Sequence, residues 1–184
     1  GQATTELVPT TTFDGAPIWL TPPDEAEIAR RRAAYFEPYH AALAAEIARV
    51  KAVHGYAVLW DCHSIKSVIP RLFPDTLPTL NLGTNSGASC APEVEAAAIA
   101  AMGDQPLSHV ANGRFKGGWI TRHYGRPGSH VHALQMEKAL SAYLAAEEAP
   151  WTFDPVRAAS LQSALSSIIA AALDAAQTLE RSRS

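Results

Sequence analysis

The sequence has few cysteines, no excess of positive charge and no continuous apolar run of about 20 residues, and each absence excludes a class of protein. Two cysteines in 184 residues are too few for a disulfide-held scaffold, and thiols in a cytoplasmic protein stay reduced. The formal net charge of -3 argues against a general nucleic-acid binder, which needs Lys and Arg to neutralise phosphates. We therefore expect no nucleic-acid partner and no membrane-spanning segment.

The first residues also lack the features of an export signal. The segment Gly1-Gln2-Ala3-Thr4-Thr5 carries no basic side chain and no apolar stretch. We therefore expect a cytoplasmic location. Because the chain begins with Gly1 rather than methionine, we also expect it to be processed or to be a fragment.

What is present is the composition of a folded domain, with 47% hydrophobic and 18% charged residues. The length fits one domain over residues 1–184, with a frayed tail at 181–184. Strands that alternate with helices predict the α/β class. The expected helices cover 21–54 (kinked at Pro38), 89–103, 138–147 and 155–179, and the expected strands cover 56–60, 80–82, 107–110 and 131–136.

The sharpest local signal is Asp61-Cys62-His63-Ser64, which follows the apolar run 56–60. Residues two apart on a strand share a face, so Asp61 and His63 can converge while Cys62 points away. This geometry argues against a Cys–His nucleophile. It suits either an imidazole metal ligand with its orienting carboxylate, or a hydrogen-bonded structural histidine.

A second signal is the glycine-rich stretch 112–118, followed by Thr121-Arg122-His123-Tyr124-Gly125. The planar guanidinium of an arginine suits a carboxylate, and glycines let the backbone approach a small ligand closely. From composition alone an ordinary surface loop is an equal alternative, with Lys116 as a solvated cation.

A third signal is the segment His130-Val131-His132-Ala133-Leu134-Gln135-Met136-Glu137. On a strand, His130 and His132 share a face, a spacing that can chelate a metal. Glu137 then lies on the opposite face with Gln135, where a carboxylate can act as general base to water. The alternative for Glu137 is an acid at the start of the expected helix 138–147.

Taken in order, several segments resemble the N-formylglutamate amidohydrolase family. The resemblance covers nearly the whole chain. It is carried by segments 1–5, 38–43, 61–65, 81–84, 112–118, 121–125 and 132–137.

The resemblance implies hydrolysis of N-formyl-L-glutamate to formate and L-glutamate, in histidine degradation, with a divalent metal of the zinc type. It implies a mixed α/β sheet flanked by helices, similar to zinc carboxypeptidases and aspartoacylase-like enzymes. By the same resemblance His63 is a metal ligand, Glu137 activates water and Arg122 holds a substrate carboxylate. The looser candidates for substrate contact are His123, Tyr124 and Asn112.

The sequence departs from the family pattern in one respect. An early Pro-His-Ser-Gly-like motif, which would supply further metal ligands, and an Asp-Leu-Asn-Arg-like motif do not occur. A single histidine does not hold a catalytic zinc, which normally has three protein ligands. We therefore expect the carboxyl-terminal part of an amidohydrolase, and the activity of this part alone is left open.

Three alternatives remain at this point. The chain could be a non-catalytic fragment or binding domain with an incomplete metal site. It could be a self-contained metal hydrolase that uses His63 with His130 or His132. It could also belong to an amidohydrolase that acts on another N-acyl amino acid.

Overall fold

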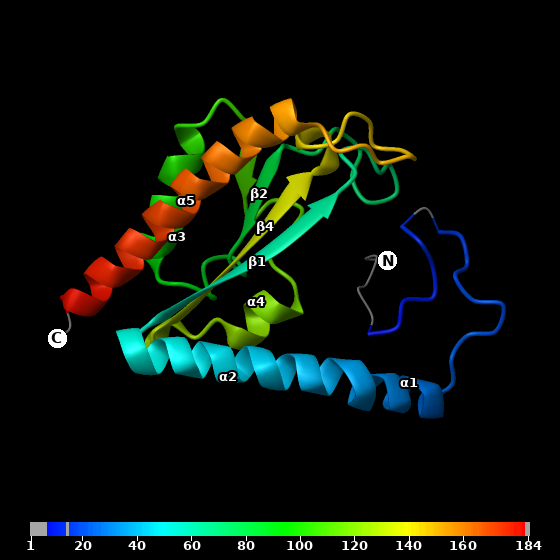
Figure 1. Ribbon diagram of the computed structural model, residues 1–184, viewed down its shortest axis with the longest axis horizontal. Coiled ribbons are helices and arrows are strands. Elements are labelled where there is room, and N and C mark those ends of the chain that lie inside the picture. The colour runs from blue at the N-terminus through cyan, green and yellow to red at the C-terminus, as the bar shows by residue number, and fades with distance from the viewer. Residues whose placement is uncertain (1–6, 14, 183–184) are drawn as a thin grey trace. The chain divides into compact units, whose positions relative to one another are not determined.

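Figure 1 shows the computed structural model of the chain, which describes residues 7–13 and 15–182. The segment 1–5, which carries part of the family resemblance, lies outside the described residues. The contacts between residues group the chain into two compact units. One unit comprises residues 1–46 and 68–76, and the other comprises residues 47–67 and 77–184.

A π-helical segment interrupts the long helix that begins in the first unit. Helix α1 (Glu25–Arg31) starts after Asp24, whose carboxylate accepts a hydrogen bond from the Glu27 N–H at 2.8 Å. The π-helix η1 (Arg32–Phe36) follows, and then α2 (Glu37–His54). We expected a kink at Pro38, but the irregularity comes just before it. A proline removes a helical hydrogen bond and crowds the preceding turn, and the wider π turn relieves this crowding.

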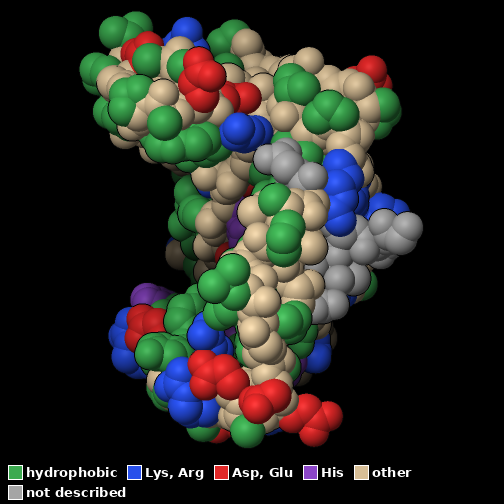
Figure 2. All heavy atoms as spheres, turned by 90° about the vertical axis from the view of Figure 1, so that its right-hand side faces the viewer, with side chains coloured by type: hydrophobic (Ala, Val, Ile, Leu, Met, Phe, Trp, Pro, Cys, Tyr) green, Lys and Arg blue, Asp and Glu red, His purple; other side chains and the backbone are tan. Residues whose placement is uncertain are grey.

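Charged side chains gather at the end of the first unit where α1 lies (Figure 2). Arg30 and Arg31 both contact the Glu27 carboxylate, at 2.6 and 2.8 Å, and Arg32 lies 3.1 Å from Glu37. The arginine run 30–32 is therefore a solvated helix surface with neighbouring carboxylates.

The second unit is built on a four-stranded mixed sheet with the order β1-β4-β2-β3. The strands are β1 (Ala57–Ile65), β2 (Leu80–Gly83), β3 (His109–Ala111) and β4 (Val131–Ala139). β1 runs parallel to β4, and β2 runs parallel to β3 but antiparallel to β4. The predicted α/β class is confirmed, with the mixed sheet that the resemblance implied.

Helices α3 (Pro92–Gly103) and α5 (Pro155–Arg181) pack against each other and cover one face of this sheet (Figure 1). α5 begins after Asp154, whose carboxylate accepts hydrogen bonds from the N–H groups of Val156 and Arg157. The largest fully buried apolar side chains of this core are Leu80, Leu82, Leu134, Met136, Val94, Met102 and Ile168.

By length and composition, α5 could cross a membrane, a property that the sequence analysis did not anticipate. This is weak evidence, because core helices of water-soluble domains pass the same test. One stripe of α5, including Leu161, Ile168 and Ala172, is buried in the core to which α3 and the sheet also contribute.

A short helix, α4 (Trp119–Tyr124), lies against the face of the sheet opposite to α3 and α5. The approach is close because the backbones meet without side chains between them. A Cβ atom placed on Gly83 of β2 would lie 2.4 Å from the Gly117 backbone nitrogen. Gly117 itself has a φ of +106°. Glycine is therefore required at both positions, and the loop before α4 lies directly on the sheet.

The predicted helix over 138–147 is wrong. β4 continues to Ala139 and is followed only by the 3-10 turn η3 (Leu140–Ala142). The strand continues because both faces of β4 are buried along most of its length, and pairing with β1 and β2 satisfies its backbone. Glu137 is thus a strand residue, and its interpretation as a helix-start acid does not apply.

Candidate active site

The pairing of β1 with β4 brings two sequence-predicted site residues side by side. In the parallel register His63 lies opposite Glu137, and Asp61 lies opposite Gln135. On β4, Gln135 and Glu137 flank Met136, whose side chain belongs to the buried core on the other face of the sheet. All four residues therefore occupy the face that α4 covers. β1 extends to Ile65 rather than ending at residue 60, so the Asp61–His63 motif lies within the strand.

Asp61 and His63 converge as the strand alternation predicts. Oδ2 of Asp61 lies 3.1 Å from Nε2 of His63, and the His63 side chain is 45% exposed. The hydrogen bond to Asp61 raises the pKa of His63, partly opposed by burial, while the charges of Asp61 and Glu137 also raise it. Because Nε2 faces Asp61, Nδ1 is the nitrogen of His63 that can act as a ligand to a metal ion.

Glu137 is a buried carboxyl group. Its residue is 6% exposed, and burial raises its pKa to about 7, although the charges of His63 and Lys138 act in the opposite direction. Within the described part of the chain, Oε1 of Glu137 has no hydrogen-bond partner. A carboxyl group with a pKa near neutrality can both take up and release a proton at physiological pH.

Gln135 also belongs to this arrangement, although it was not among the predicted site residues. Its Oε1 accepts a hydrogen bond of 2.6 Å from the Gly118 N–H, which fixes the start of α4 on the sheet. Arg122, exposed on α4, donates from Nη1 to the Gly117 carbonyl oxygen at 2.7 Å. The strand alternation predicted that Gln135 shares the face of Glu137, but its contact with Gly118 is a long-range feature that no local pattern predicts.

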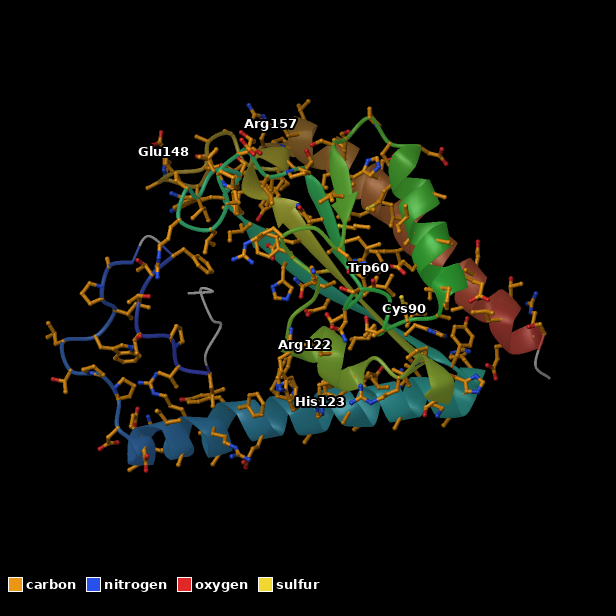
Figure 3. The ribbon with its side chains drawn as sticks, turned by 180° about the vertical axis from the view of Figure 1, so that it is seen from behind. Trp60, Cys90, Arg122, His123, Glu148 and Arg157 are labelled. Carbon is orange, nitrogen blue, oxygen red and sulfur yellow. The ribbon has the colours of Figure 1, made fainter. Side chains whose placement is uncertain are left out.

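His123 and Tyr124, two further predicted site residues, belong to an aromatic group on α4. The His123 ring stacks on Trp119 with centroids 4.0 Å apart and an interplanar angle of 14°. Tyr124 contacts both rings edge-on. Figure 3 shows Arg122 and His123 together on this helix. The stacking holds His123 against Trp119, and contact of either residue with substrate stays a prediction.

The Asn112 side chain has a structural role in the fold. Its Oδ1 accepts hydrogen bonds from the N–H groups of Thr84 and Ser86, at 2.9 and 3.1 Å. Its Nδ2 donates to Oγ1 of Thr84 and to Oε1 of Glu95, each at 2.8 Å. A substrate contact by this amide would have to replace one of these four bonds.

The predicted chelating pair His130 and His132 does not form. His130 precedes β4 with a φ of +59°, and its Nδ1 lies 2.6 Å from Oε2 of Glu180. His132 is 3% exposed, and its Nδ1 accepts a hydrogen bond from the Ala91 N–H. His132 also lies opposite Val58, on the other face of the sheet from His63. The alternative of a self-contained metal hydrolase with these histidines is therefore wrong.

The described residues contain no group of three or more His, Cys, Asp or Glu side chains that could hold a metal ion. His63 offers one nitrogen, and Asp61 is engaged with the other nitrogen of the same ring. This donor set does not complete a catalytic zinc site, which normally takes three protein ligands.

Comparisons with known proteins identify one family. The family model for N-formylglutamate amidohydrolase matches residues 1–144. An N-formylglutamate deformylase of Pseudomonas aeruginosa is 52% identical over 157 residues, which cover 82% of this chain and 58% of that protein. A protein of the same name from Pseudomonas putida is 45% identical over 178 residues, covering 93% of this chain and 65% of that protein.

A solved structure confirms the fold. The crystal structure of an N-formylglutamate amidohydrolase from Ralstonia eutropha JMP134 superposes with a TM-score of 0.73 at 24% sequence identity. The match covers 91% of this chain and 60% of that chain. This chain thus spans about three fifths of the length of the proteins that it matches.

Proposed function

Because the chain belongs to the N-formylglutamate amidohydrolase family, we propose that it is part of an enzyme that hydrolyses N-formyl-L-glutamate to formate and L-glutamate. The observation that carries this proposal is the register that sets the buried carboxyl of Glu137 opposite His63. We use "full-length enzyme" for a chain of the relatives' length that contains this sequence. Its proposed place is histidine degradation in the cytoplasm, and its proposed wider fold resembles zinc carboxypeptidases and aspartoacylase-like enzymes.

Glu137 has the properties of a general base for this reaction. Ionised Glu137 takes a proton from a water molecule as the water oxygen attacks the formyl carbon. The same carboxyl then gives that proton to the amide nitrogen, so that the C–N bond breaks and L-glutamate leaves with a neutral or protonated amine. The raised pKa of Glu137, about 7, suits both transfers at neutral pH.

Arg122 is the proposed anchor for a glutamate carboxylate. Its guanidinium is exposed on α4, and its hydrogen bond to Gly117 fixes it to the glycine loop that Gln135 holds on the sheet. A bidentate contact from Arg122 to a glutamate carboxylate would orient the substrate and so position its formyl group. Arg122 would take no part in the bond changes themselves. Strand β4 thus carries the proposed base Glu137 and, through Gln135, also holds the loop to which Arg122 is bonded.

A test of this proposal measures formate release by the full-length enzyme. N-formyl-L-glutamate, N-formyl-L-aspartate and N-acetyl-L-glutamate serve as parallel substrates. The proposal expects the highest kcat/KM for N-formyl-L-glutamate. A higher value for either of the other compounds would favour the alternative of a different N-acyl amino acid, and no turnover of any of the three would favour a non-catalytic domain.

Arg122→Gln in the full-length enzyme is expected to raise KM for N-formyl-L-glutamate by about 10- to 100-fold, with a smaller change in kcat. Glutamine can keep one hydrogen bond of the bidentate contact, so the variant loses one charge-assisted hydrogen bond to the substrate, which contributes about 1.5–3 kcal/mol. Steady-state kinetics measure the two constants. Lys116→Gln, which removes an exposed positive charge from the same loop, is the matched control. An equal change in both variants would contradict the anchor assignment.

We also propose that the full-length enzyme binds a divalent metal ion, with zinc as its proposed identity. His63 contributes one ligand to it, and residues outside this sequence contribute the others. We expect the isolated chain to retain far less than one equivalent of zinc after dialysis, and the full-length enzyme to retain about one. Elemental analysis measures both. His63→Ala should lower the zinc content of the full-length enzyme, whereas the control His109→Ala, exposed on β3, should not. Undiminished zinc in His63→Ala would refute the ligand assignment.

A further inference from the structure

The carboxylate of Glu147, which lies outside the proposed site, contacts the two segments that follow strands β1 and β4. Ser67 comes two residues after the end of β1, and Ser141 comes two residues after the end of β4. His63 and Glu137 each lie four residues before one of these serines. The Glu147 side chain contacts both serines, so it joins the chain just beyond the two site residues.

The contacts engage both oxygens of the carboxylate. Oε1 of Glu147 accepts from the Ser141 N–H at 2.7 Å and from the Ser67 N–H at 2.9 Å. Oε2 accepts from the Ser67 hydroxyl at 2.7 Å and shares the Ser67 N–H at 3.0 Å. Hydrogen bonds to an ionised acceptor are the stronger kind, and here every one of them comes from the two strand ends.

The ends of these strands need such a tie. β1 lies at the edge of the four-stranded sheet, and its residues 62–64 are exposed. Terminal parts of edge strands open more readily than the centre of a sheet. A second tie supports the same segment, because the hydroxyl oxygens of Ser64 and Tyr143 lie 2.7 Å apart.

We propose that Glu147 is a positioning residue that fixes the separation of His63 from Glu137 by joining the carboxyl ends of β1 and β4. This inference rests on the proposed function for its catalytic consequence, but its structural part can be tested without turnover. A displacement of about 1 Å between reacting groups can lower a rate by about 100-fold. The carboxylate therefore acts on catalysis through the two strands, by way of its bonds to Ser67 and Ser141.

Glu147→Gln is the informative variant because it keeps the shape of the side chain. The amide has a single oxygen and an NH₂ group, so one of the two acceptors becomes a donor, which either faces an N–H group or makes the Ser67 hydroxyl accept instead of donate. The negative charge that strengthens the bonds from Ser67 and Ser141 is lost in either case. Glu148→Gln is the matched control. Glu148 is the neighbouring exposed acid, and Figure 3 shows it at the opposite end of this unit from Arg122 and His123.

The first measurement uses the chain itself and needs no activity. In Glu147→Gln, amide hydrogen exchange at Ser67 and Ser141 should accelerate at least about tenfold. The imidazole NMR signals of His63 should shift, whereas exchange in the centre of α3 and α5 should stay as in the wild type. Glu148→Gln should change none of these. Unaltered exchange at both serines, or unaltered His63 signals, would overturn the proposal.

The second measurement uses the full-length enzyme. Glu147→Gln should lower kcat at least about tenfold while KM stays within about threefold, because Arg122 lies on α4 and not on the tied segments. Unchanged kcat with accelerated exchange would overturn the positioning role. If the wild-type enzyme releases no formate, the proposed function fails, and the exchange and NMR results still decide whether Glu147 joins the strand ends.

Discussion

Glu137→Gln is expected to lower kcat of the full-length enzyme for N-formyl-L-glutamate by about 100- to 10,000-fold, the usual contribution of a general base. Glutamine keeps the size and the buried position of Glu137 but cannot accept a proton from water. The diagnostic result is a fall in kcat, measured as formate release, without a comparable change in KM. KM should change little, because the proposed carboxylate anchor Arg122 is intact.

The control for this experiment is Glu93→Gln, which changes an exposed acid at the start of α3. Zinc content and thermal stability of both variants show whether the fold and the metal site persist. If Glu137→Gln turns over substrate at a rate close to that of the wild type, the base assignment is wrong. The proposed mechanism would then need another proton acceptor.

The metal-free isolated chain should lose stability as the pH rises from about 4 to 8, and Glu137→Gln should remove most of this loss. Burial raises the pKa of Glu137 from 4.5 to about 7. The folded chain therefore holds this proton more tightly than the unfolded chain does, and unfolding becomes easier once the pH exceeds the unfolded pKa. The shift corresponds to about 3 kcal/mol as an upper bound, fully expressed above pH 7.

Urea unfolding at several pH values measures this effect. His63, whose pKa is also raised, contributes a loss in the same direction, so the decisive quantity is the difference between wild type and Glu137→Gln at each pH. This difference should grow in favour of the variant between about pH 4.5 and 7 and then level off. A difference that stays constant with pH would show that Glu137 is not a buried titrating group.

Alternation along the strands made the centre of the candidate site predictable. Asp61 and His63 share a face because β1 runs through both, and Gln135 and Glu137 share a face of β4 for the same reason. The pairing of the two strands, with His63 opposite Glu137, is a long-range property. Local periodicity contains no information about it, and only the family resemblance suggested it.

The predictions that were wrong relied on local sequence patterns, which the tertiary structure overrides. The segment after Glu137 has helix-forming residues, but the sheet extends β4 and its burial decides the conformation. The predicted chelate of His130 and His132 assumed a regular strand, whereas the backbone at His130 is left-handed. α4 was missed because a helix of six residues among glycines leaves almost no periodic pattern.

The edge position of β1 has a consequence for how the site could be completed. Within the described sheet β1 pairs only with β4, so the other side of its backbone offers main-chain donors and acceptors for hydrogen bonding. A strand added on that side would bring alternate side chains next to Asp61 and His63. Further metal-ligating side chains would thus lie beside the His63 imidazole, while the pairing of β4 with β1 and the position of Glu137 stay unchanged.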